Sequence, residues 1–172
     1  MGITLQPIMK RHMMRNTFSF ALMVFLLFCL SQNSYEQSIS NQQKEEIGER
    51  VDSIFHCMIK SAENLDFDQL CQGVDDKHSA GFILNGVYFS HFDSLINTLR
   101  GLSGSAIRQS ITLLNEKVSV LSQNIVVLTA FGISNVEIND GNHKTSKFFW
   151  SFVYEKEGPH WKVIQSHQSS IR

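Results

Sequence analysis

The chain has 172 residues, enough for one ordinary domain, and its 42% hydrophobic and 18% charged residues are typical of a folded globular protein, not a disordered one. Lys10, Arg11 and Arg15 precede every acidic residue, and without them the formal net charge falls from −1 to −4. A nucleic-acid partner requires a clustered basic surface. Because no cluster of Lys and Arg follows Arg15, the sequence argues against nucleic-acid binding.

The first 31 residues have the three parts of a secretion signal. The basic segment is followed by an apolar run over 18–30, which is shorter than the roughly 20 residues that span a membrane. A polar stretch comes next. We expect cleavage after Ser31, a linker over 32–39, and export to the periplasm or the extracellular space. Two alternatives stay open: lipidation through Cys29 and an uncleaved N-terminal anchor.

A long helix is predicted over 40–63, because apolar residues recur there at helical spacing. Ser40 and Gln43 have the spacing of a capping box. Cys57 lies within this helix and Cys71 beyond it. Export would permit a disulfide between them. We favour two unpaired cysteines in the core, where a free thiol behaves as a small apolar side chain.

Shorter elements follow this helix. Asp66 is a candidate cap for a short helix over 67–72, and a short strand over 80–84 ends at the turn dipeptide Asn85-Gly86. Ser90, with Asp93 three residues later, is expected to cap a third helix. Its apolar side chains keep helical spacing, and glycines terminate it. The apolar side chains are Phe92, Leu95, Ile96, Leu99 and Leu102, and the glycines are Gly101 and Gly104.

The last third of the chain is rich in strand-forming residues. Four strands are predicted, over 107–116, 118–138, 145–156 and 160–168, and the short turns between them require antiparallel pairing. Residues 148–154 alternate poorly between apolar and polar, although a strand with one wet face should alternate. Since one helix can cover only one face of the sheet, we expect a homodimer through the other face.

The final strand, Trp161-Lys162-Val163-Ile164-Gln165-Ser166-His167-Gln168-Ser169, resembles the ending of many proteins of the nuclear transport factor 2-like superfamily. The similarity is greatest to the SnoaL-like and ketosteroid-isomerase-like bacterial branch, and it covers residues 40–170. It implies an α+β fold in which a cone-shaped, strongly curved, mainly antiparallel sheet wraps around a long N-terminal helix. It also implies a pocket at the wide end and frequent dimers. Members of the superfamily include enzymes and binding modules, so fold does not decide function.

Pleating gives the expected pocket its first polar candidates. If Lys162 faces water, then Trp161, Val163, Gln165 and His167 lie on the concave face. A histidine there could serve as a general base or as a hydrogen-bond anchor. The alternative is a structural His167 that is bonded to a backbone carbonyl or to a neighbouring side chain.

Aromatic residues are the second group of candidates for the pocket. Phe82, Tyr88 and Trp150 could line it together with Gln165 and His167, because small apolar ligands require aromatic walls and few polar groups. Phe92 is interpreted as core. The cluster Asp75, Asp76 and His78 is interpreted as a solvated turn, so no metal and no cofactor are expected.

The carboxylates of the isomerase pattern are missing from the strands over 80–84 and 145–154. The leading hypothesis is therefore an exported domain that binds a small apolar or amphipathic molecule, without assured catalysis. One alternative is a SnoaL-like isomerase, dehydratase or hydrolase that uses His167 as its base. The other is a non-catalytic dimeric assembly module.

Overall fold

The computed structural model describes residues 39–171. The predicted signal peptide over 1–31, Cys29, and nearly all of the linker predicted over 32–39 lie outside the described residues. Among the described helices, none is both long enough and apolar enough to cross a membrane.

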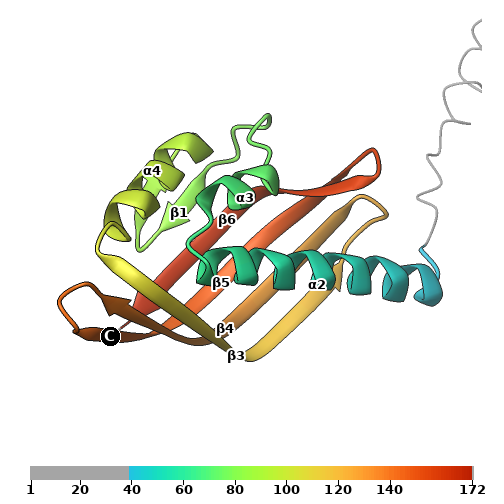
Figure 1. The fold of residues 1–172 in the computed structure, drawn as a ribbon. Coiled ribbons are helices and arrows are strands. Elements are labelled where there is room, and N and C mark those ends of the chain that lie inside the picture. Colours follow the sequence, from blue (N-terminus) through green and yellow to red (C-terminus); the bar gives the residue numbers. More distant parts are fainter. Residues whose placement is uncertain (1–38, 172) are drawn as a thin grey trace, which may run out of the picture. The chain divides into compact units, whose positions relative to one another are not determined.

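Helix α2 spans Asn41–Glu63 and begins as the sequence predicts (Figure 1). The Ser40 hydroxyl accepts a hydrogen bond from the backbone N–H of Gln43, and the Gln43 side chain accepts one from the backbone N–H of Ser40. This reciprocal pair satisfies two donors that a helix start leaves free. Val51, Phe55 and Ile59 are buried along one stripe, which packs the helix onto the sheet.

A short helix and a hairpin come next. Helix α3 spans Phe67–Gln72, and Asp66 caps it by accepting from the Gln69 N–H. Strand β1 spans Phe82–Leu84 and pairs with β2, Val87–Phe89, which the sequence reading missed. The connecting Asn85 and Gly86 both have positive φ, as a two-residue hairpin turn requires.

Helix α4 spans Phe92–Leu102, and its predicted cap is wrong. The N-cap residue is His91, whose side chain makes no capping hydrogen bond. Asp76, sixteen residues upstream, accepts a hydrogen bond from the Phe92 N–H at 3.1 Å instead. A local sequence pattern cannot reveal a cap that comes from a distant loop.

Four long strands complete the fold: β3 at Ala106–Val120, β4 at Ile125–Ile138, β5 at His143–Glu157 and β6 at His160–Ile171. The predicted break at residue 117 is wrong, because β3 continues to Val120 and turns over 121–124. The Ser122 hydroxyl accepts from the N–H groups of Asn124 and Ile125 in that turn.

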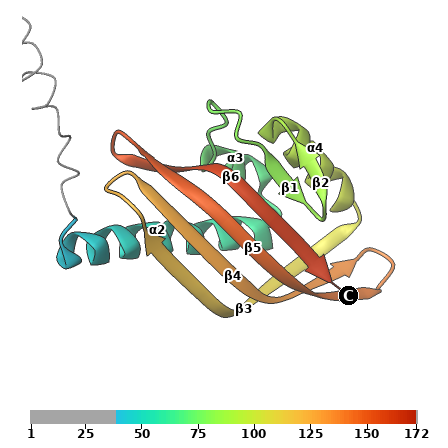
Figure 2. The same cartoon turned by 180° about the vertical axis from the view of Figure 1, so that it is seen from behind.

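The six strands form one curved sheet in the order β2-β1-β6-β5-β4-β3, in which β1 and β6 are parallel and every other pair is antiparallel. Helix α2 lies across the concave face, with α3 and α4 above β1 and β6 (Figure 1). Seen from behind, β3 to β6 lie in front of α2 (Figure 2), so this helix covers the concave face only. The predicted α+β cone is confirmed.

Within residues 39–171 Cys57 and Cys71 are both free, and the expectation that they are core residues is wrong, because neither belongs to the hydrophobic core cluster and Cys71 is only half-buried. Cys57 is exposed on α2, whereas its neighbour Met58 packs against the core. Helical spacing therefore predicts the direction of the buried face of α2, but which residues at its margin are buried depends on the surface that the helix packs against.

Candidate functional site

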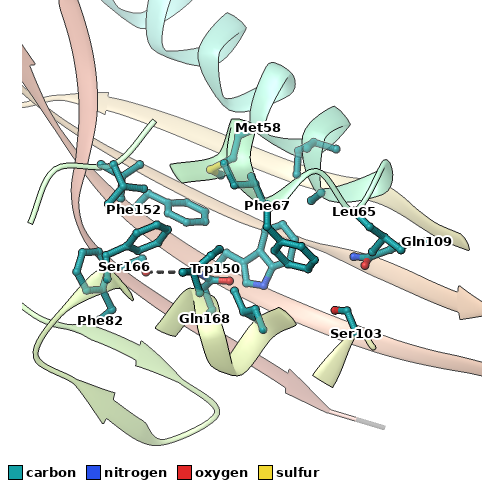
Figure 3. A pocket seen from close by; sticks show the side chains of 18 residues that line it. Met58, Leu65, Phe67, Phe82, Ser103, Gln109, Trp150, Phe152, Ser166 and Gln168 are labelled. Carbon is teal, nitrogen blue, oxygen red and sulfur yellow. Dashed lines mark hydrogen bonds between the residues drawn. The ribbon is translucent and has the colours of Figure 1, made fainter. Parts of the chain in front are cut away.

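An apolar pocket lies between the last turns of α2, helices α3 and α4, and the concave face of β5 and β6 (Figure 3). Its volume is about 150 Å³. Aliphatic and aromatic side chains make up most of the wall: Met58, Ile59, Ala62, Leu65, Phe67, Leu70, Val74, Phe82, Phe92, Ile96, Leu99, Trp150, Phe152 and Val163.

The polar groups of the pocket are few and uncharged. Gln109 and Ser103 lie at one side, and Ser166 and Gln168 project from β6 (Figure 3). The Gln168 amide donates to the Ser166 hydroxyl at 3.3 Å, and Ser166 is almost completely buried. None of the described residues that line the pocket has an ionisable side chain. The pocket can therefore supply apolar contact and neutral hydrogen bonds.

The predicted placement of His167 and Gln165 on the concave face is wrong, and a β-bulge is the reason. Tyr154 pairs with Val163 but Val153 pairs with Gln165, which leaves Ile164 as an extra residue in β6. One extra residue reverses the alternation beyond it. Ser166 and Gln168 therefore face the pocket in place of Gln165 and His167.

His167 is exposed and lies on the outer face of the sheet, in a shallow hollow with Lys117, Thr129, Ser151 and Ser169. No hydrogen bond or ion pair of its side chain occurs within residues 39–171. The structural alternative, in which His167 is bonded to the sheet, has no support in this geometry either.

The aromatic candidates separate into two groups. Phe82 and Trp150 line the pocket, and Trp150 stacks on Phe148 with ring centroids 3.9 Å apart. Tyr88 is 62% exposed on β2 and takes no part in the pocket. Phe92, interpreted from the sequence as core, is partly buried against the core and lines the pocket as well.

Sequence reasoning missed the four polar residues of the pocket: Ser103, Gln109, Ser166 and Gln168. One signal was available in β6, where Val163 and Ile164 are consecutive apolar residues. Such a doublet interrupts the alternation of a half-buried strand, and this one coincides with the bulge. Nothing in the local sequence marks Ser103, which follows the last turn of α4, or Gln109, which lies near the start of β3.

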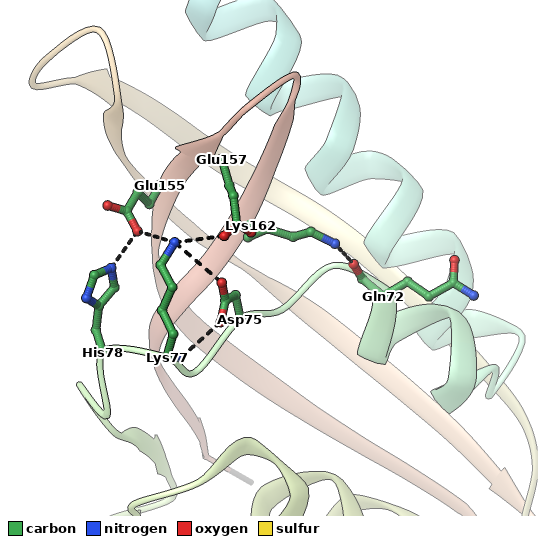
Figure 4. A network of polar contacts seen from close by, with 7 residues as sticks. All are labelled: Gln72, Asp75, Lys77, His78, Glu155, Glu157 and Lys162. Carbon is green, nitrogen blue, oxygen red and sulfur yellow. Dashed lines mark hydrogen bonds and ion pairs between the residues drawn. The ribbon is translucent and has the colours of Figure 1, made fainter.

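A polar network ties the loop after α3 to the β5–β6 hairpin (Figure 4). The Lys77 ammonium lies 3.0 Å from Glu157 and 3.5 Å from both Glu155 and Asp75. His78 Nε2 lies 2.6 Å from Glu155. The predicted turn over 75–78 is thus present, and its charged side chains are engaged with each other and with the hairpin.

This network predicts a pH dependence of stability. A hydrogen bond from the Lys77 N–H lowers the pKa of Asp75, and one from His78 lowers the pKa of Glu155. A carboxyl group whose pKa is lowered by folding stabilises the fold fully at pH values above its pKa in the unfolded chain, here 3.8 for Asp75 and 4.5 for Glu155. That contribution is lost as the pH falls through the folded value.

We therefore expect the free energy of unfolding in urea to fall less steeply in Glu155→Gln than in the parent between pH 5 and about pH 3. Glu49→Gln, on the exposed side of α2, is the matched control and should keep the parent slope. Equal slopes for both variants would contradict a role for Glu155.

A second charged group lies where α2 crosses β3. His56 Nε2 is 3.1 Å from Glu116 and 3.7 Å from Asp52. This nitrogen and one carboxylate oxygen of each acid, atoms that could bind a metal ion, all lie within 4.8 Å of one another. Pairing between a histidine and two carboxylates accounts for this geometry without a metal ion.

A family model described as the calcium/calmodulin dependent protein kinase II association domain matches residues 51–172. The chain matches no curated protein by sequence. Among solved structures, one from Xanthomonas campestris, provisionally described as such an association domain, is 13% identical with a TM-score of 0.61 and covers 71% of this chain and 86% of that chain.

Two further solved structures share the fold. A protein of the nuclear transport factor 2-like family from Streptomyces avermitilis, provisionally described as a dehydratase, is 14% identical with a TM-score of 0.65, covering 74% of this chain and 98% of that chain. A superfamily protein from Salmonella enterica is 16% identical with a TM-score of 0.61, covering 76% and 92%. The predicted resemblance to the nuclear transport factor 2-like superfamily is confirmed.

Proposed function

This chain belongs to the calcium/calmodulin dependent protein kinase II association domain family, which has the nuclear transport factor 2-like fold, and we propose that its apolar pocket binds a small, uncharged, mainly apolar molecule. The ligand class is one aromatic ring, or an aliphatic body of similar size, with one hydroxyl or carbonyl group.

The apolar pocket supports this proposal. Buried cavities of about 150 Å³ lined by Leu, Ile and Phe stay dry and take up benzene-sized ligands. The pocket beside Trp150 has the same volume and a similar wall. Its amide and hydroxyl groups, among them Gln168 and Ser103, would select for a ligand with a hydrogen-bonding group at one end.

Binding is favoured over the alternative of catalysis by His167. A general base must lie within hydrogen-bond reach of the proton that it removes. His167 and the pocket are on opposite faces of the sheet, and the lining residues within 39–171 include no acid and no histidine. The Streptomyces structure is provisionally described as a dehydratase, but that description concerns a protein only 14% identical to this one.

A substitution that fills the pocket tests the proposal. Ala62, at the end of α2, lines the pocket, and Ala62→Leu places three more carbon atoms in it. We expect binding of benzyl alcohol to weaken at least about tenfold, or 1.4 kcal/mol, while the protein stays folded. Ligand-observed NMR titration measures the affinity, and circular dichroism follows the fold.

Ala80→Leu provides the matched control, because Ala80 is exposed in the loop before β1 and does not line the pocket. Its affinity for benzyl alcohol should equal that of the parent protein. Absence of saturable binding to the parent, or equal affinities for all three proteins, would overturn the proposal.

Self-association through the outer face of the sheet is a second candidate function. Phe131 in β4 and Phe149 in β5 are cross-strand partners whose stacked rings have centroids 6.1 Å apart. The two residues are 41% and 47% exposed. Exposed aromatic pairs framed by polar side chains are typical of protein interfaces. The matching family is named for association, which fits a homodimer through this face.

Phe149→Lys tests this interface. We expect it to weaken self-association by at least about 2 kcal/mol, or roughly thirtyfold, because a charge would replace a central aromatic contact. Sedimentation equilibrium measures the dissociation constant. Leu102→Lys, at a 68% exposed position of α4, is the control and should associate like the parent. A parent protein that stays monomeric at high concentration would refute the interface.

A further inference from the structure

A second and larger hollow lies on the other side of Met58, Leu70 and Val163, which line both it and the apolar pocket. It is an open groove of about 530 Å³ between α2, α3 and the start of β6. Small-molecule sites commonly have volumes of about 300–1,000 Å³. The groove therefore has the size of a ligand site, and its chemistry differs from that of the apolar pocket.

The groove is basic, although the chain as a whole has a formal net charge of −1. Arg50, His160 and Lys162 line it, and none of its described lining residues is acidic. Arg50 and His160 take part in no ion pair within residues 39–171. The Lys162 ammonium donates to the backbone carbonyl of Gln72, a neutral acceptor that leaves its charge uncompensated (Figure 4).

Tyr154 contributes an unsatisfied donor to the same site. Tyr154 is 1% exposed and belongs to the groove wall, and its hydroxyl has no hydrogen-bond partner within residues 39–171. Leaving a buried hydroxyl unpaired is unfavourable. Because burial raises the pKa of Tyr154, the phenol stays protonated at neutral pH, and it can donate to a ligand oxygen once a shift of the groove wall uncovers the hydroxyl.

The rest of the wall combines uncharged polar side chains with apolar ones, among them Ile54, Pro159 and Trp161. From this juxtaposition we propose that the groove binds an organic carboxylate with an apolar chain, whose charge is balanced by Arg50 and Lys162 and one of whose oxygens accepts from Tyr154. Arginine and lysine form strong, charge-assisted hydrogen bonds with carboxylates. The apolar chain distinguishes this ligand from a free inorganic anion.

Octanoate and 1-octanol are the probes, because they share a chain and differ in charge. We expect octanoate to shift backbone amide NMR signals of residues 69–73 and 160–163. In contrast, 1-octanol should shift signals of residues 92–103, because α4 and its C-cap residue border the apolar pocket but not the groove. The octanoate affinity should fall as salt rises. Octanoate that binds no better than 1-octanol at residues 69–73 and 160–163 would overturn the proposal, as would inorganic phosphate that competes equally well.

Charge removal completes the experiment. The double variant Arg50→Gln/Lys162→Gln should bind octanoate at least about tenfold more weakly. Lys60→Gln/Lys144→Gln removes two positive charges at exposed positions outside the groove and should bind octanoate like the parent. Binding of benzyl alcohol should be unchanged in both, which shows that each variant is folded. Equal octanoate affinities for the two double variants would overturn the proposal.

Discussion

Gly132→Ala is expected to destabilise the domain by about 3 kcal/mol or more. Gly132 is buried in the middle of β4, opposite the bulge that leaves Leu114 unpaired in β3. A Cβ atom there would collide with the backbone carbonyl oxygen of Thr112 and would lie 2.7 Å from the Phe148 ring. Because a backbone oxygen in a paired strand cannot move as a flexible side chain does, the sheet itself must distort.

Urea denaturation at pH 7 measures this loss as a lower transition midpoint. Gly101→Ala is the matched control, since Gly101 lies in α4 with nothing within 4 Å of the added carbon. It should stabilise the protein by about 0.5–1 kcal/mol, because alanine is the better helix former. A Gly132→Ala variant as stable as the parent would mean that β3 and β4 are less tightly paired than the structure indicates.

Elements whose signals are local could be predicted from the sequence. The capping box at Ser40, the cap at Asp66 and the positive-φ turn at Asn85 involve residues within three positions of each other, and the structure has all three. Elements fixed by distant partners could not. The start of α4 is set by Asp76, sixteen residues upstream.

The pocket depended on both kinds of information. Phe82 and Trp150 could be named because a pocket for a small apolar ligand requires aromatic walls, although the same reasoning also named Tyr88, which is 62% exposed. The polar wall could not, since the bulge at Ile164 reverses the face of every later residue in β6. At that point Val163 pairs with the segment around Val74, and β1 pairs with β6 beyond the bulge. Which segments pair with this edge of β6 depends on the tertiary structure, so this pairing could not be predicted from the sequence of β6.

Phe55→Ala is expected to destabilise the domain by about 3–5 kcal/mol. Phe55 is fully buried in the centre of the α2 stripe, and its ring lies 5.9 Å from that of Phe152 on the concave face. Truncation removes the apolar contacts and leaves a cavity that Val51 and Ile59, fixed on the same helix, cannot fill.

A loss of this size is comparable to much of the total stability of a small domain, which is typically about 5–15 kcal/mol. Phe55→Ala should therefore shift the thermal midpoint by well over 10 °C, whereas Leu102→Ala, an apolar truncation at a 68% exposed position, should leave it nearly unchanged. Differential scanning calorimetry at equal protein concentrations distinguishes the two. If Phe55→Ala melted with the parent, α2 would not be fixed to the sheet by this ring, and a rigid pocket beneath its last turns would lose its physical basis.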